Sequence, residues 1–428
     1  MIRTAAQADD PSPLPLYDKD PQHLWNRLSS AITTCAPEGK PVPPDLLDPP
    51  YLDLLFAGEA KMEAVALLNE FLASEVTLVA MAPIQRALMQ RDLLAAFHQL
   101  TEGEWTSAKR ELATALARAI RRVALAPEEI RTLPDNYAAA TVSLGIPTAD
   151  DPAHPAPFLP KDLLADDGPW ILLATEGTET AVVPRFHFKT FRARSSFEVR
   201  MHHPDGRAAG EAYLKALADM AQPWVYEESA EAQELKPNVP DNGIWPNPAT
   251  PQFPVGTAWA LVRRAMLADS NGRPVVSPLV ESVQIRVYRA ASPKALMQSP
   301  DFQSVVNELE KSSSDYNLLD FVAARYMTSF EWEMKRALVL EKGGFHLTVP
   351  DDLPFSGFSP SEKRPIASFC MQCHSAPGIH SVQSRARLFS EALELKPSNR
   401  ASLDRVTTSE ARKQPGWLLL EWLWQENF

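Results

Sequence analysis

The chain has 428 residues, of which 45% are hydrophobic and 22% are charged, and its formal net charge is −12. This composition is typical of globular proteins, and the length predicts two or three domains rather than a single core. The negative charge argues against a nucleic-acid partner, because such partners are bound by basic surfaces that displace counterions from phosphates. Since no run of about 18 apolar residues occurs, the sequence predicts no transmembrane span.

Residues 1–20 are predicted to be an export-signal remnant or a disordered leader. Ala6-Gln7-Ala8 has the small-x-small form of a signal peptidase site, and an acidic, proline-rich stretch follows it. The apolar core of a signal peptide is not in these residues, so this interpretation places it upstream of Met1. The alternative is an ordinary N-terminus in which the Ala-x-Ala pattern occurs by chance.

Residues 21–165 are predicted to form a helical domain that ends in a proline-rich linker. Two groups of apolar residues recur with helical spacing: Val65, Leu68 and Leu72, and then Leu112, Leu116, Ile120 and Val123. Thr106 is placed to cap the second helix and Pro127 to end it. From Leu133 to Pro169 prolines and aspartates crowd together, which predicts a domain boundary near residue 165.

Residues 166–297 are predicted to form a β-rich domain. Val283, Ile285 and Val287 alternate with Gln284, Arg286 and Tyr288, as in an antiparallel strand. The sequence from Asp269 to Pro274 has turn chemistry, so a hairpin is expected there. A helix is expected from Arg207, whereas the segment RFHFK around His187 alternates as strands do.

Residues 298–428 are predicted to be a helical C-terminal segment that carries the functional motif. The stretch from Gln298 to Leu340 has apolar residues at three-to-four spacing, and Trp417, Leu420 and Trp424 form an apolar stripe on a last helix. The predicted fold class is therefore α+β, with a helical N-terminal domain, an antiparallel middle domain and this segment.

The stretch FCMQCHSAPGIH, from Phe369 to His380, holds two of the three cysteines in a C-x-x-C-H pattern. On a helical turn Cys370, Cys373 and His374 share one face. Two thiols can then form thioethers with the haem vinyl groups while the imidazole reaches the iron. The pattern therefore predicts attachment of a c-type haem.

Two other kinds of site share the Cys-x-x-Cys spacing. A tetrahedral zinc site needs a second Cys or His pair, and the nearest candidate is His380. A thioredoxin-like dithiol sits where a strand enters a helix, whereas this pair follows the loop-like sequence SGFSPSEKRP. Haem c is the favoured interpretation, because the only other cysteine is Cys35.

The segment from Phe369 to His380 resembles the attachment site of c-type cytochromes. The resemblance implies one covalent haem c per chain, with Cys370 and Cys373 as thioether sites and His374 as the proximal iron ligand. It also implies a periplasmic or extracytoplasmic location, because haem c is attached after export. The chain departs from the common small cytochromes c, since no methionine follows Met371 to serve as the second ligand. A motif near the C-terminus is similar to that of the cytochrome c prime type, in which the distal position can be open.

Four further residues are candidates for contacts with the haem. His346 and His203 lie near predicted turns, so they are candidate distal ligands, and the ordinary alternative is a surface or hydrogen-bonded histidine. Arg385 and Arg387 follow the motif and are candidate partners of the haem propionates, unless they form a solvated charge cluster.

Three functions are compatible with the motif. The favoured one is a monohaem electron-transfer or redox-partner protein, in which the upstream region binds a redox protein and tunes the iron. The second is a haem enzyme or a gas or peroxide sensor, which would bind a small ligand at an open distal site. The third is an exported structural protein that uses haem as a covalent staple. The sequence alone leaves open whether the chain is an enzyme.

Overall fold

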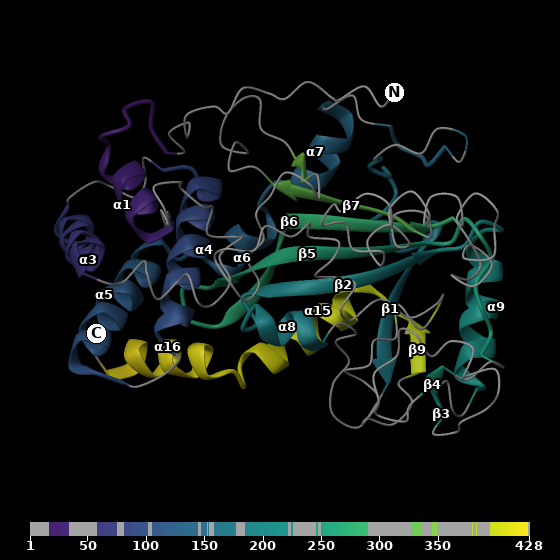
Figure 1. The fold of residues 1–428 in the computed structure, drawn as a ribbon. Helices are drawn as coiled ribbons and strands as arrows, with labels where there is room; N and C mark the ends of the chain where they lie inside the picture. Colours follow the sequence, from purple (N-terminus) through teal and green to yellow (C-terminus); the bar gives the residue numbers. More distant parts are fainter. Residues whose placement is uncertain are drawn as a thin grey trace, which may run out of the picture.

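The computed structural model describes residues 17–33, 58–74, 81–101, 105–143, 147–151, 153, 158–176, 185–220, 224–225, 245–246, 250–289, 327–334, 345–348, 379, 382 and 394–426. Most helices lie at one end of a central antiparallel sheet, and others lie along its sides and at its far end (Figure 1). The α+β class expected from the sequence is confirmed. The predicted domain boundaries remain predictions.

The main sheet has seven strands in the order β8-β7-β6-β5-β2-β1-β9, and every neighbouring pair is antiparallel. The strands are β1 (Trp170–Glu176), β2 (Ser195–His202), β5 (Ala258–Ala268), β6 (Pro274–Tyr288), β7 (Met327–Met334), β8 (Phe345–Thr348) and β9 (Glu394–Pro397). Two short strands, β3 (Trp224–Val225) and β4 (Trp245–Pro246), pair separately. The strands that flank the C-x-x-C-H motif in sequence, β8 and β9, are therefore the two outer strands of the sheet.

The predicted hairpin is confirmed as β5 and β6. The Asp269 carboxylate accepts the backbone N–H groups of Asn271 and Arg273, at 2.8 and 2.9 Å, and so holds the turn closed. Gly272 has a φ of 79°, a conformation that residues with a Cβ adopt only at a cost. The turn chemistry of this segment thus sets the register of the two longest strands.

The N-terminal helices are α1 (Leu24–Thr33), α3 (Gly58–Ala73), α4 (Pro83–Leu100), α5 (Ser107–Val123), α6 (Pro127–Arg131) and α7 (Asn136–Ser143). The predicted cap of α5 is confirmed, because Thr106 Oγ1 accepts the backbone N–H of Lys109 at 3.2 Å. Four more helices follow: α8 (Arg185–Thr190), α9 (Arg207–Ala218), α15 (Arg400–Ala411) and α16 (Pro415–Glu426). Within the described residues, no helix is long and apolar enough to cross a membrane.

Two local predictions were wrong. The segment around His187 is helix α8 rather than a strand. Its carbonyls are used by the turn that follows, in which the N–H of Ala193 donates to the Phe188 carbonyl at 2.9 Å. The stretch predicted as helix from Gln298 to Leu340 contains strand β7, whose sequence MTSFEWEM also alternates and which finds its hydrogen bonds on β6. In both places tertiary pairing overrides a weak local pattern.

Three apolar clusters hold these elements together, of which the smallest packs Leu125, Ile130 and Leu133 against β5 and β6. The main core joins the N-terminal helices, the sheet and α16; its members include Trp25, Phe97, Leu116, Val283 and Trp417. The second core lies at the α9 end of the sheet, and its buried members are Ile171, Leu173, Met201, Leu214, Leu217, Phe253, Trp259, Tyr288, Ile379 and Leu395. The second core is the part of the fold that bears on the predicted haem site.

Candidate functional site

The predicted attachment residues Cys370, Cys373 and His374 lie outside the described residues, as do Cys35, His380, Arg385 and Arg387. Haem c therefore remains a prediction from the sequence. Within the part of the chain that the structure describes, no group of three or more His, Cys, Asp or Glu side chains is arranged to hold a metal ion.

The chain is anchored to the second core just after the motif. Ile379 is fully buried there, and its backbone N–H donates to Gln252 Oε1 at 3.0 Å, while Val382 packs against the same core. His374 precedes Ile379 by five residues, which span at most about 18 Å when fully extended. The chain therefore limits the separation of His374 from Ile379 to about 18 Å.

The strand register identifies the sheet face on which this anchor lies. Ile171 pairs with Met201, Met201 with Trp259, and Trp259 with Arg286, and directly opposed residues point to the same face. We call this row, together with the residues two positions before and after its members on the same strands, the second-core face. Helix α9 covers its β1 and β9 end (Figure 1).

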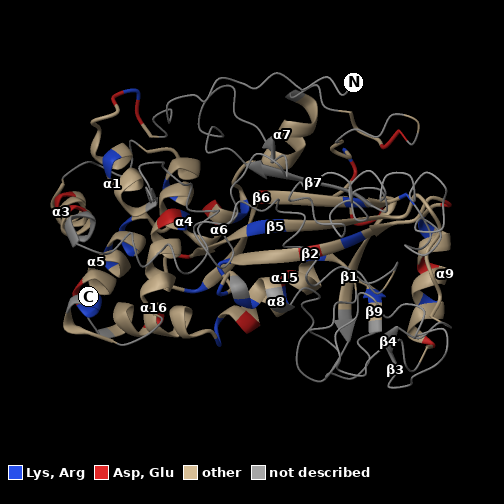
Figure 2. Cartoon of the chain, in the orientation of Figure 1, with Lys and Arg blue, Asp and Glu red and all other residues tan. Residues whose placement is uncertain are grey.

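Two arginines on central strands continue the second-core face away from α9. Arg286 is 8% exposed, and its Nη2 donates to Gln284 Oε1 at 3.2 Å. Arg263 is 6% exposed, lies 4.6 Å from the centre of the Phe191 ring, and forms an ion pair with Glu281 at 3.5 Å. Basic positions on the inner strands are visible in Figure 2. Buried guanidinium groups are rare without a partner, so these residues mark a polar strip on an otherwise apolar surface.

His187 faces the same polar strip from α8. Burial, and then the charges of Arg286 and Arg263, lower the pKa of this imidazole to about 4. The ring is therefore neutral at pH 7. Its position next to two guanidinium groups was not evident from the sequence, where His187 was expected on a strand.

The candidate distal ligand His203 lies between β2 and α9 at the border of the second core. Its ring is buried, stands 6.5 Å from the Tyr213 ring, and accepts the backbone N–H of Asp205 at Nδ1, at 3.2 Å. An accepting Nδ1 carries no proton, so Nε2 must carry it. Histidines that bind metals show the reverse pattern and donate from the nitrogen that is not coordinated. This hydrogen bond argues against iron ligation by His203.

The other candidate, His346, belongs to the outer strand β8. The register pairs it with Glu333 of β7, and its side chain lies outside the described residues. Because β8 and β9 are separated by six inter-strand spacings of about 4.8 Å, roughly 29 Å lie between the two edges.

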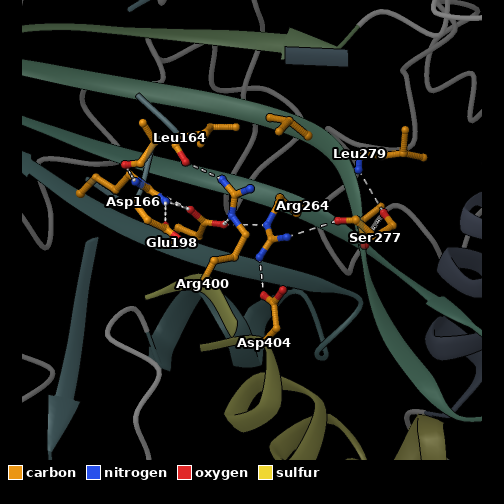
Figure 3. Close-up of polar contacts among 12 residues, drawn as sticks. Leu164, Asp166, Glu198, Arg264, Ser277, Leu279, Arg400 and Asp404 are labelled. Carbon is orange, nitrogen blue, oxygen red and sulfur yellow. Dashed lines mark hydrogen bonds and ion pairs between the residues drawn. The ribbon is translucent and has the colours of Figure 1, made fainter. Parts of the chain in front are cut away.

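A buried ion-pair network, which the sequence did not predict, lies on the opposite face of the sheet (Figure 3). Glu198 on β2 is fully buried, and its carboxylate lies 2.9 Å from Arg200 Nη2, 2.7 Å from Arg264 Nε and 3.4 Å from Arg400 Nε. Burial alone would raise the pKa of Glu198, but the three guanidinium groups outweigh it and hold that pKa below its usual value. The charged i, i+2 pair in SSFEVRMHH was the only local signal for this network.

Helix α15 supplies the other half of the network. Asp404 accepts from Arg264, and Arg400 Nη2 donates to the carbonyl of Leu164 at 3.0 Å (Figure 3). Burial raises the pKa of Asp404 despite the attraction of Arg264. Since α15 follows β9 directly, these contacts attach the chain after β9 to the sheet. The charges of the network are paired with one another, which is the pattern of a structural ion-pair network.

Comparison with protein-family models, with curated proteins and with solved structures finds no match for this chain. Its function must therefore be inferred from its own residues.

Proposed function

We propose that this chain is an exported monohaem c-type cytochrome-like protein that exchanges electrons with a redox protein partner. The observation that carries the proposal is the sequence Cys370-x-x-Cys373-His374 in a chain with only one other cysteine. Cys370 and Cys373 would hold the haem through thioethers, and His374 would bind the iron. The bound haem supplies one-electron chemistry between ferric and ferrous iron.

The remainder of the chain supports this proposal by the environment it offers. Ile379 and Val382, which follow the motif by five and eight residues, attach the chain to an apolar core. An apolar, anchored surrounding is one of the means by which proteins set the reduction potential of a haem. Attachment of haem c after export is the reason for proposing a periplasmic or extracytoplasmic location.

The decisive experiment is the mass of the protein made with an export signal and a haem c maturation system. We expect the intact mass to exceed that of the polypeptide by about 616 Da, the mass of one haem held by thioethers. Cys373→Ser should lose the double attachment, while Cys35→Ser is the matched control and should keep the full mass. A wild-type mass equal to the bare polypeptide would reject the proposal in favour of a zinc site or a dithiol pair. A zinc assay would distinguish these two alternatives.

A second candidate is a haem enzyme or a gas or peroxide sensor with an open distal position. The observation that favours it is the accepting Nδ1 of His203, which argues against that residue as sixth ligand. Ferrous protein mixed with carbon monoxide distinguishes the two. An electron carrier with both axial positions filled should bind carbon monoxide only after its second ligand is removed, with His346→Ala as the first variant to test. Immediate binding by the wild type would support the open site.

A further inference from the structure

We propose that a pocket between the β5–β6 turn and the C-terminal helices binds an oxyanion, the phosphate or carboxylate group of a small ligand. The pocket has a volume of about 240 Å³. The residues that line it are Gly272, Arg273, Pro274, Arg412, Trp417 and Glu421. The inference is independent of the haem, because none of these residues belongs to the second core or to the C-x-x-C-H motif.

The first reason is the charge of the two arginines. Arg273 directly precedes β6 and Arg412 is the C-cap of α15, so two distant parts of the chain bring a guanidinium group to the same pocket. Both residues are exposed, and neither guanidinium forms a hydrogen bond or an ion pair with any residue that the structure describes. Two like charges that line one pocket repel each other, and a bound anion offsets this repulsion.

The second reason is the composition of the wall. Its surface is mostly polar, and Glu421 is the only acidic residue that lines it. The Glu421 carboxylate accepts a hydrogen bond from Gln425 Nε2 at 3.5 Å and forms no ion pair with a described residue. The side chains therefore give the pocket two positive charges and one negative charge. This local excess of positive charge occurs in a chain whose formal net charge is −12.

The third reason is that the walls are held in place without a ligand. The Asp269 carboxylate accepts the backbone N–H of Arg273 at 2.9 Å, which fixes the turn. A Cβ on Gly272 would stand 2.7 Å from the Trp424 ring, so the turn packs closely on α16. Trp417 is buried in the main core. A pocket whose walls are already ordered loses less conformational entropy when a ligand binds.

The size of the pocket and its hydrogen-bond donors together define the ligand. Its volume is below the range of about 300–1,000 Å³ that is typical of pockets for drug-sized molecules. The ligand that fits is therefore a small oxyanion or the charged end of a larger molecule. Guanidinium groups present parallel N–H donors that match the oxygens of phosphate and carboxylate groups.

The test is an NMR titration of the full chain at constant ionic strength, with inorganic phosphate and, separately, with malonate. We expect saturable shifts of the Nε–H signals of Arg273 and Arg412, which Arg273→Lys and Arg412→Lys identify by their loss. Arg412→Gln should weaken the binding of the anion about fivefold, the effect of a good surface ion pair. Glu421→Gln should strengthen it about twofold, because a repelling charge is removed. The matched control is Arg405→Gln on the exposed side of α15, where Arg405 donates to Ser402 Oγ at 3.2 Å, and it should leave the affinity unchanged.

The outcomes decide as follows between support and rejection. Saturable binding of phosphate alone, of malonate alone or of both supports the inference and identifies the group that the pocket takes. Absence of saturable shifts with both probes would overturn it. An affinity that is unchanged in Arg412→Gln, or equally weakened in Arg405→Gln, would also overturn it, because anions would then be attracted to surface arginines in general. The proposed function stands or falls separately, on the mass of the attached haem.

Discussion

At the scale of single residues, Gly416 lies against the ring of a fully buried histidine. His98 has no hydrogen-bond partner on either ring nitrogen among the described residues, and a Cβ on Gly416 would stand 2.5 Å from its Nδ1. Burial, and then Arg194 and Arg192, lower the pKa of His98 well below its usual value, although the nearby Arg192 carbonyl opposes this, so the ring packs as a neutral group.

Gly416→Ala is therefore expected to destabilise the protein by about 2–3 kcal/mol, the cost of overpacking a rigid core. Helix propensity alone predicts the opposite sign, a gain of up to about 1 kcal/mol. Urea unfolding of the variant decides between the two. The control is the same substitution made in His98→Ala protein. There the added methyl group has room, so Gly416→Ala should cost much less stability than it does in the wild type. A stabilised single variant would show that His98 can move away.

At the scale of elements, the ion-pair network determines how α15 is attached to the sheet. Glu198→Gln leaves the guanidinium groups of Arg200, Arg264 and Arg400 without their shared carboxylate. Because uncompensated buried charge is costly, we expect a loss of about 3–5 kcal/mol in the free energy of unfolding. Glu211→Gln is the matched control, since Glu211 forms an exposed pair with Arg207 on α9 and should change stability by less than about 0.5 kcal/mol.

The same carboxylate predicts a dependence of stability on pH. The folded-state pKa of Glu198 is lowered, whereas an unfolded Glu titrates near about 4.3. The contribution of Glu198 to the free energy of unfolding is therefore complete above the unfolded-state pKa. It is lost as the pH falls through the lower, folded-state pKa. We expect the difference in unfolding free energy between wild type and Glu198→Gln to shrink as the pH is lowered below about 4. A difference that is constant from pH 7 to pH 3 would contradict this titration.

Elements with strong local signals were predictable, and those made by distant pairing were not. The β5–β6 hairpin followed from alternation and from the turn at Asp269, and α5 from its apolar spacing and the Thr106 cap. Strand β9 has only four residues, with Pro397 at its end, and exists because β1 offers it hydrogen bonds. The polar strip formed by Arg286 and Arg263 could not be predicted from the sequence for the same reason. Nothing in the sequence places Arg286 beside Trp259 until the register of β5 and β6 is known.

At the scale of the whole molecule, the C-terminal helix joins parts of the chain that are distant in sequence. Trp417 Nε1 donates to the carbonyl of Ala193 at 2.9 Å, and Trp424 Nε1 donates to the carbonyl of Ala117 on α5 at 3.0 Å. Both rings are buried in the main core, together with residues of α1, α4 and the sheet. Helix α16 therefore stabilises the N-terminal helices and the sheet at once.

This shared core predicts that damage to α16 spreads through the molecule. Trp424→Ala removes a ring that is 8% exposed and packs against Gly272 of the hairpin turn, so we expect a loss of about 3–5 kcal/mol. Trp422→Ala is the matched control on the same helix, because Trp422 is 46% exposed and its loss should cost less than about 1 kcal/mol. Hydrogen exchange should report the effect of Trp424→Ala both in α5 and in β5. Loss of protection confined to α16 would show instead that this helix is an appendage, and that the helical layer and the sheet hold together without it.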